Sequence, residues 1–293
     1  MKKVFKLVLV LTCTTSLFFV GCRKKETTEV DNETQSAVDN AVADQEYMSI
    51  VPATNAHAIN TKGTGATNGK LLSPPACDTL IWLTRSATLA TDTALDVNGK
   101  YNVPQRFELN LTTTCTASFT DNKIRSGKWL IRITGPLKNV GSQMIMKLIN
   151  HKASGIGYAC DSLVVTTVAS SSVSSTYNIK LINGVCSSPN WTIKYSFDRT
   201  ITNFVKGNPV GSDPVVQIYG TANGVNRTGK SFTVDIPAGS PMIKHKSCQF
   251  VDKGILNLTP EGFKTRIVDF GNGTCDDDAT FTVNGSTVAF KLK

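Results

Sequence analysis

The chain lacks most of the residue patterns that mark a particular chemistry. It has three histidines, and no two cysteines show the CxxC spacing, so nothing indicates a zinc site. A GxSxG nucleophile elbow is missing as well. From residue 76 onward the glutamates are Glu108 and Glu261, so a glycosidase pair would have to come mainly from aspartates. These absences argue against an enzyme and indicate no resident cofactor.

Residues 76–293 also lack a long amphipathic helix pattern. Apolar and polar residues instead alternate with a period of two, as they do over 191–198, which is typical of a half-buried strand. The segment 281–290 places Asn284-Gly285 between two apolar runs, a strong hairpin signal. The pattern predicts an all-β fold, either a β-sandwich or barrel-like antiparallel sheets. Further strands are expected at 106–112, 127–134, 143–149, 161–168, 176–182, 215–221, 231–236, 254–258 and 264–270.

Only one apolar run is long enough to engage a membrane, and it stands at the N-terminus. Lys2 and Lys3 precede an apolar run over 4–20, which ends in LFFVGC with Cys22 last. A basic start, an apolar stretch and a small residue before the cleavage point are the marks of a secretory signal. We therefore expect a lipoprotein signal peptide over 1–21 and a lipid on Cys22. The alternative is an uncleaved membrane anchor, because the run could just span a bilayer.

Residues 22–75 are poor in large apolar side chains. Residues 23–46 contain seven acidic residues against three basic ones, although the whole chain has a formal net charge of +9. Apolar positions recur at near-helical spacing between 34 and 50, so a short helix is expected there, docked on the domain or free of it. Residues 52–75 resemble a flexible linker in composition. We expect a mostly flexible tether over 22–75 and one β domain over 76–293.

Six cysteines follow Cys22, and an even number in an exported chain indicates disulfides. Six cysteines allow 15 pairings. A faint internal repeat, in which one cysteine leads a strand and another closes the next strand, favours two similar β units and narrows the choice. The pairs it predicts are Cys77–Cys115, Cys248–Cys275 and, as the remainder, Cys160–Cys186.

Two short basic segments resemble each other, and each is expected to form a hairpin tip. The first holds Arg125 and Lys128, and the second holds Arg227 and Lys230. If the tips lay side by side, they would form a surface that binds an anion or a glycan. The alternative is a pair of ordinary solvated turns.

Three further patterns suggest sites but favour plainer interpretations. Residues 224–231 (GVNRTGKS) match the phosphate-loop pattern, but an alternating strand follows where that loop needs a helix, so a hairpin turn is expected. Asp276-Asp277-Asp278 leaves a calcium site open, although an acidic turn is the simpler interpretation. Trp82, Trp129 and Trp191 could form a sugar platform, but each lies in an alternating strand, which favours core packing.

The segment AVDNAVADQEY at 37–47 and most of 215–293 resemble an uncharacterised family of Bacteroidota lipoproteins. The resemblance is weaker over 77–205. It implies an exported β protein with paired cysteines, located at the outer membrane, and it implies no activity.

Taken together, these features favour a non-enzymatic lipoprotein of the outer membrane that binds a glycan or an anionic envelope component. A structural or assembly role in the outer membrane is the alternative, and a glycan hydrolase comes third. The membrane is the expected partner through Cys22, and no nucleic acid is expected.

Overall fold

The computed structural model describes residues 31, 33–60, 71–72, 79–84, 96–102, 104–112, 123–204, 213–248 and 250–292. The chain divides into two units, Met1–Asn32 and Glu33–Lys293. All helices and strands described below belong to the second unit. The expected tether therefore ends much earlier than residue 75, because the compact unit begins at Glu33.

Within the described residues, one helix, α2 (Gln35–Asn60), precedes sixteen strands. The strands are β1 (Leu71–Leu72), β2 (Thr79–Thr84), β3 (Gln105–Leu111), β4 (Arg125–Ile133), β5 (Gln143–Ala153), β6 (Ile156–Ala159), β7 (Ser162–Ser170), β8 (Ser174–Ser188), β9 (Trp191–Phe204), β10 (Val215–Val225), β11 (Ser231–Ile236), β12 (Met242–His245), β13 (Lys253–Pro260), β14 (Arg266–Asn272), β15 (Asp278–Val283) and β16 (Ser286–Lys291).

The strands form one antiparallel sheet in nearly sequential order. Short strands β6 and β7 share the space between β5 and β8, and β11 and β12 do the same between β10 and β13. The predicted all-β, antiparallel fold with an N-terminal helix is confirmed. Because the strands belong to one continuous sheet, the fold is nearer to the barrel-like alternative than to two stacked sheets.

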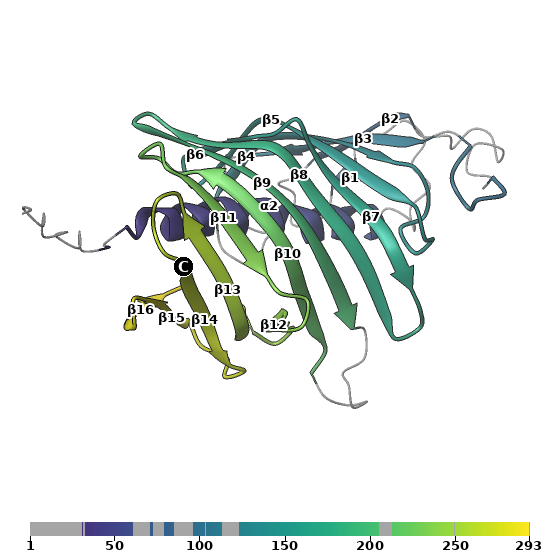
Figure 1. Cartoon of the computed structure of the whole chain (residues 1–293). Coiled ribbons are helices and arrows are strands. Elements are labelled where there is room, and N and C mark those ends of the chain that lie inside the picture. The colour runs from purple at the N-terminus through teal and green to yellow at the C-terminus, as the bar shows by residue number, and fades with distance from the viewer. Residues whose placement is uncertain are drawn as a thin grey trace, which may run out of the picture. The chain divides into compact units, whose positions relative to one another are not determined.

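Helix α2 lies on the concave side of the bent sheet and crosses its strands (Figure 1). Its buried residues Ala43, Tyr47 and Ile50 belong to the same core cluster as Trp129 and Tyr195 of the sheet. Apolar residues at alternating strand positions supply the other side of this core, as periodicity requires. The helix is therefore part of the hydrophobic core of the fold and not a segment of a tether.

The helix also extends past its predicted end at residue 50. It continues through Pro52 to Asn60, a stretch expected to belong to a flexible linker. Thr54 is buried there, and its hydroxyl donates to the Ile50 carbonyl oxygen at 2.9 Å. Small and polar residues suggested a linker, but packing against the sheet overrides local composition.

The predicted hairpin at 281–290 is confirmed. Asn284 and Gly285 connect β15 to β16, and both have positive φ values, 53° and 78°. Two consecutive residues in the left-handed region give the tight turn whose twist matches that of paired strands.

Candidate functional site

Acidic side chains of α2 are buried against basic side chains of the sheet. Arg125 at the start of β4 donates to both carboxylate oxygens of Glu46, each at 2.8 Å, and both side chains are almost fully buried. His151 of β5 approaches the same carboxylate at 2.9 Å through Nε2, while its Nδ1 lies 3.1 Å from the Ser126 carbonyl oxygen. Two basic groups thus surround one buried carboxylate.

These two basic partners and the burial of the site together set the pKa of Glu46. Burial removes water from the carboxylate and by itself would raise its pKa. Hydrogen bonds from His151 and Arg125, together with their charges, outweigh that effect, so the pKa of Glu46 is lowered. The carboxylate stays ionised inside the fold because its partners are fixed around it.

The same pairing recurs toward the helix N-terminus. Arg199 of β9 donates to Asp44 at 3.0 Å, and the Tyr195 hydroxyl donates to the same oxygen at 2.9 Å. Arg227, just after β10, donates to Asp39 through Nε at 2.7 Å. The N-terminal half of the helix is therefore fixed against the sheet by ion pairs as well as by apolar packing.

The four basic residues predicted to form an anion site each contact a partner within the protein. Arg125 does not lie at an exposed hairpin tip, because its guanidinium is 1% exposed. Lys128 pairs with Glu108 at 2.9 Å. Arg227 lies over the Trp191 ring at 4.3 Å, and Lys230 lies over a phenylalanine ring. For Arg125 the predicted tip position is wrong, since a helix that the sequence placed in a tether covers it.

With the helix on the concave side, the outer side of the sheet is the surface that a ligand can reach. Two cross-strand rows of polar side chains lie on it. Register pairs Asp198 with Thr221 and Thr221 with Asp235, and it continues the row to Lys180 and Asn257. Residues of one row point the same way because paired residues in a sheet share a face.

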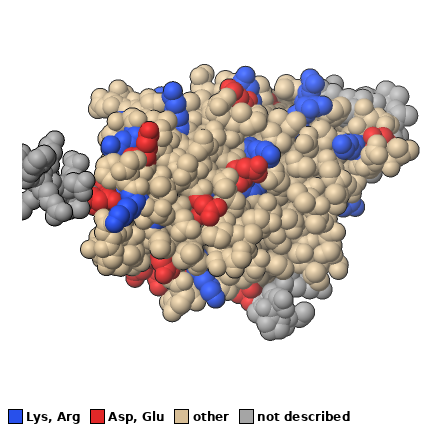
Figure 2. Space-filling model, in the orientation of Figure 1, with Lys and Arg blue, Asp and Glu red and all other residues tan. Residues whose placement is uncertain are grey.

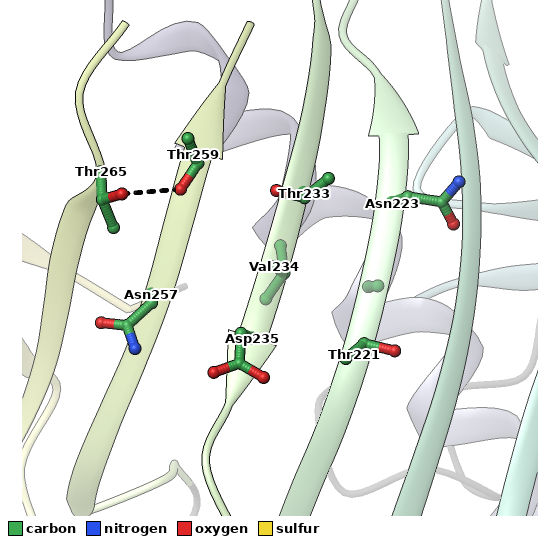
Figure 3. Close-up of a pocket in the computed structure, with 9 residues that line it drawn as sticks. Thr221, Asn223, Thr233, Val234, Asp235, Asn257, Thr259 and Thr265 are labelled. Carbon is green, nitrogen blue, oxygen red and sulfur yellow. Dashed lines mark hydrogen bonds between the residues drawn. The ribbon is translucent and has the colours of Figure 1, made fainter.

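The second row lies two residues further along the strands and is uncharged. Register pairs Ser196 with Asn223, Asn223 with Thr233, and Thr233 with Thr259. Thr259 shares a hydrogen bond of 2.8 Å with Thr265 of the turn before β14. Figure 3 shows how these hydroxyl and amide groups lie on neighbouring strands.

The two rows line two adjoining hollows. The larger, of about 540 Å³, lies over β10, β11 and β13, and the smaller, of about 250 Å³, lies over β8, β9 and β10. They share Thr221, Ala222 and Asn223, so they join across β10. We name the two rows and the hollows between them the outer track.

Charge on the outer track is low and nearly balanced. Lys180 and Asp198 form an ion pair of 2.9 Å, which leaves Asp235 as a further carboxylate. Burial tends to raise the pKa of Asp198, but hydrogen bonds from Asn178 and Lys180 outweigh it, so the pKa is lowered. Charged side chains are sparse on this side of the molecule (Figure 2). The track offers mainly hydroxyl and amide groups.

The outer track was missed from the sequence, although a signal for it exists. Outward positions of an alternating strand carry Thr221 and Asn223 on β10 and Thr233 and Asp235 on β11. Alternation predicts that these residues face solvent. Which strands become neighbours, and hence whether the residues align, is decided by the sheet order.

Three other predicted sites can be checked on the described residues. Residues 226–230 form the turn between β10 and β11, so the expected hairpin turn is confirmed and β11 stands where a phosphate loop needs a helix. Asp277 and Asp278 both pair with Lys291, at 2.5 and 2.7 Å. In the described part of the chain, no group of three or more His, Cys, Asp or Glu side chains is placed to hold a metal ion.

Of the two interpretations of the tryptophans, the favoured core packing fits those that can be judged better than a sugar platform does. Trp129 is fully buried in the core, as packing predicts, and Trp191 is half-buried beneath Arg227. The side chain of Trp82 lies outside the described residues. An aromatic stacking surface is therefore no part of the outer track.

Of the predicted disulfides, Cys248–Cys275 is present. Cys160 and Cys186 are buried free thiols, so the third predicted bond is not formed. The strand register explains this. Cys186 is paired with Tyr158, and Cys160 follows Tyr158 by two residues, so the two cysteines are diagonal neighbours and not directly opposite each other. Diagonal neighbours are farther apart than a disulfide allows. Cys77 and Cys115 lie outside the described residues.

Comparisons with protein-family models, with curated proteins and with solved structures gave no match. The helix that the structure describes does not combine the length and the apolar character that crossing a membrane requires. The predicted lipid site, Cys22, and the rest of the signal segment lie outside the described residues.

Proposed function

We propose that the chain is a lipoprotein of the outer membrane, anchored through Cys22, whose β domain binds a glycan along the outer track. The observation that carries the binding proposal is the alignment of hydroxyl and amide side chains in two rows across neighbouring strands. Sugars present hydroxyl groups that donate and accept hydrogen bonds, as threonine hydroxyls and asparagine amides do. Rows of such groups match a ligand of repeated hydroxyls.

The form of the track favours a neutral ligand over an acidic one. Asp235 is exposed, and the positive charge of Lys180 is matched by Asp198. A polyanion approaching this surface would meet no net positive charge. The proposal therefore replaces the anionic ligand expected from the basic hairpins with a neutral glycan on the outer side of the sheet.

Binding can be tested with the mature chain, residues 22–293, by screening a glycan array and then titrating a bound glycan by calorimetry. The double variant Asn223→Ala/Asn257→Ala removes one amide from each row. Each lost hydrogen bond is worth about 0.5–1.5 kcal/mol, so affinity should fall about tenfold or more. The control Asn98→Ala/Asn190→Ala, at exposed turns away from the track, should bind as the parent does. Absence of any bound glycan, or equal affinity in both double variants, contradicts the proposal.

Hydrolysis of the bound glycan is the second candidate, because Asp198 and Asp235 flank Thr221 in one row. Two strand spacings separate them, about 9.6 Å, near the wide end of the range for inverting glycosidases. A general acid needs a raised pKa, however, and that of Asp198 is lowered. We favour binding without turnover, so new reducing ends should not appear when the protein is incubated with its glycan. Their appearance, and its loss in Asp235→Asn, would establish the hydrolase instead.

The lipid anchor has a separate test. Cells that express the chain and grow on an alkyne-labelled fatty acid should attach the label to the parent and not to the Cys22→Ala variant. The parent should fractionate with the outer membrane. Label on the Cys22→Ala variant, or an unlabelled parent, would show that the anchor has been wrongly assigned.

A further inference from the structure

Antiparallel pairing brings several turns of the chain to one end of the sheet. Val225, the last residue of β10, pairs with Lys194 near the start of β9 and with Ser231 at the start of β11. The same alternation places the β5–β6, β8–β9 and β13–β14 turns at this end. We name it the Glu33 end, formed by the turns at 154–155, 189–190, 226–230 and 261–265.

The compact unit begins at this same end. The Glu33 carbonyl oxygen accepts hydrogen bonds from Arg266 at 2.8 and 3.1 Å. Asn226 donates to the Ser36 hydroxyl at 3.0 Å. The first residues of the unit are therefore held against the β10–β11 and β13–β14 turns.

Glu33 lies eleven positions after Cys22 in the chain. A chain of that length can span at most about 40 Å. If Cys22 carries a lipid, as proposed above, the Glu33 end is tied close to the bilayer surface. Surface charge at that end then acts within a few screening lengths of the lipid headgroups.

The charge at the Glu33 end is positive. Lys152, Lys194, Lys230 and Lys264 are exposed in or next to its turns, whereas the turns hold one exposed acidic residue, Glu261. The arginines of this end do not contribute to that surplus, because they pair with acidic or backbone groups of the helix segment. Four lysine charges are thus left to face solvent.

The opposite end of the sheet is mixed in charge. Its described turns carry exposed aspartates, including Asp276 and Asp277, together with exposed lysines such as Lys138 and Lys246, and Asp277 binds Lys291. At the Glu33 end, by contrast, the exposed lysines clearly outnumber the exposed acidic residues of the turns. Local clusters of lysine next to a membrane anchor attract anionic lipid, each adding to the attraction.

We propose that the Glu33 end is a membrane-contact surface, whose lysines bind the anionic headgroups of the bilayer next to the anchored Cys22. The partner is a lipid surface with negative charge, recognised by several lysines at once and not by one headgroup pocket. A second, electrostatic contact beside a lipid chain makes membrane attachment firmer than either contact alone. It also orients the domain, with the Glu33 end toward the bilayer.

The test uses the mature chain, residues 22–293, with Cys22→Ser so that no lipid contributes. Flotation with vesicles of one part anionic phosphatidylglycerol to two parts phosphatidylcholine should recover the protein at low salt. Pure phosphatidylcholine vesicles and 1 M salt should each abolish recovery, because salt at that concentration screens charges beyond about 3 Å. Reversal of the four lysines, in K152E/K194E/K230E/K264E, should weaken binding by at least about a hundredfold.

A variant of equal charge change serves as the control. K138E/K147E/K246E/K253E alters four exposed lysines away from the Glu33 end and should lose much less binding. Circular dichroism confirms that both variants fold. Equal loss in the two variants, retained binding in the first, or no binding of the parent to anionic vesicles each overturns the proposal. None of these outcomes depends on fatty-acid labelling of Cys22, so failure here is distinguishable from failure of the proposed anchor.

Discussion

Glu46 of the helix and Arg125 of β4 form a two-point ion pair, with both hydrogen bonds at 2.8 Å, at a place from which water is excluded. The sequence separates the two residues by 79 positions. Their contact requires the helix to lie inside the bent sheet, and it gives each buried charge its counter-charge.

Glu46→Gln should destabilise the fold by about 3–5 kcal/mol, because it leaves Arg125 buried without its counter-charge and His151 with a weaker partner. Urea unfolding followed by circular dichroism measures the change. Glu108→Gln makes the same substitution in the more exposed pair with Lys128 and should cost less than about 1 kcal/mol. Similar costs for the two variants would show that the helix contact is not energetically distinct.

The contribution of Glu46 should disappear in acid. Its pKa is lowered in the folded protein, so its stabilisation is fully present above the unfolded pKa of about 4.3 and is lost as the pH falls through the folded value. The difference in unfolding free energy between parent and Glu46→Gln should therefore be constant from pH 7 to about 5 and shrink below that. A difference that grows toward low pH would mean that the pKa is raised instead.

Cys160 and Cys186 should be unreactive in the native protein. Burial raises the pKa of Cys160 to about 11 and that of Cys186 to about 12, so little thiolate exists near pH 8. Iodoacetamide treatment followed by peptide mapping should leave both unmodified until urea is added. The peptides of Cys248 and Cys275 should appear linked before reduction. A linked Cys160–Cys186 peptide would restore the third bond expected from the sequence.

Gly220 of β10 should tolerate a side chain far less than Gly229 does. Both have positive φ values, 126° and 86°, but a Cβ at Gly220 would lie 2.3 Å from the Asp198 carbonyl oxygen, while nothing lies within 4 Å at Gly229. Gly229→Ala should cost about 1–2 kcal/mol for backbone strain alone. Gly220→Ala should cost clearly more in the same urea measurement, since β9 and β10 must also separate. Equal costs would show that the two strands adjust without penalty.

Local sequence predicts much of the sheet. Strand β11 is found over the predicted residues, Asn284-Gly285 forms the predicted turn, and the false phosphate loop is a hairpin, because alternation and turn chemistry act over a few neighbouring residues. The helix was expected to be short and peripheral. Asp39, Asp44 and Glu46 have the character of solvated residues in isolation, and only their basic partners on distant strands allow them to be buried.

For the candidate site and the membrane surface, too, local patterns could be predicted from the sequence and long-range contacts could not. The sequence by itself determined that strands alternate, that cysteines 248 and 275 pair, and which threonine and asparagine side chains face outward. The tertiary structure decided that those side chains align across three strands, that Arg125 is withdrawn from solvent, and that exposed lysines lie where the compact unit begins. Each of these depends on which strands become neighbours, and a long-range pairing leaves no local pattern in the chain.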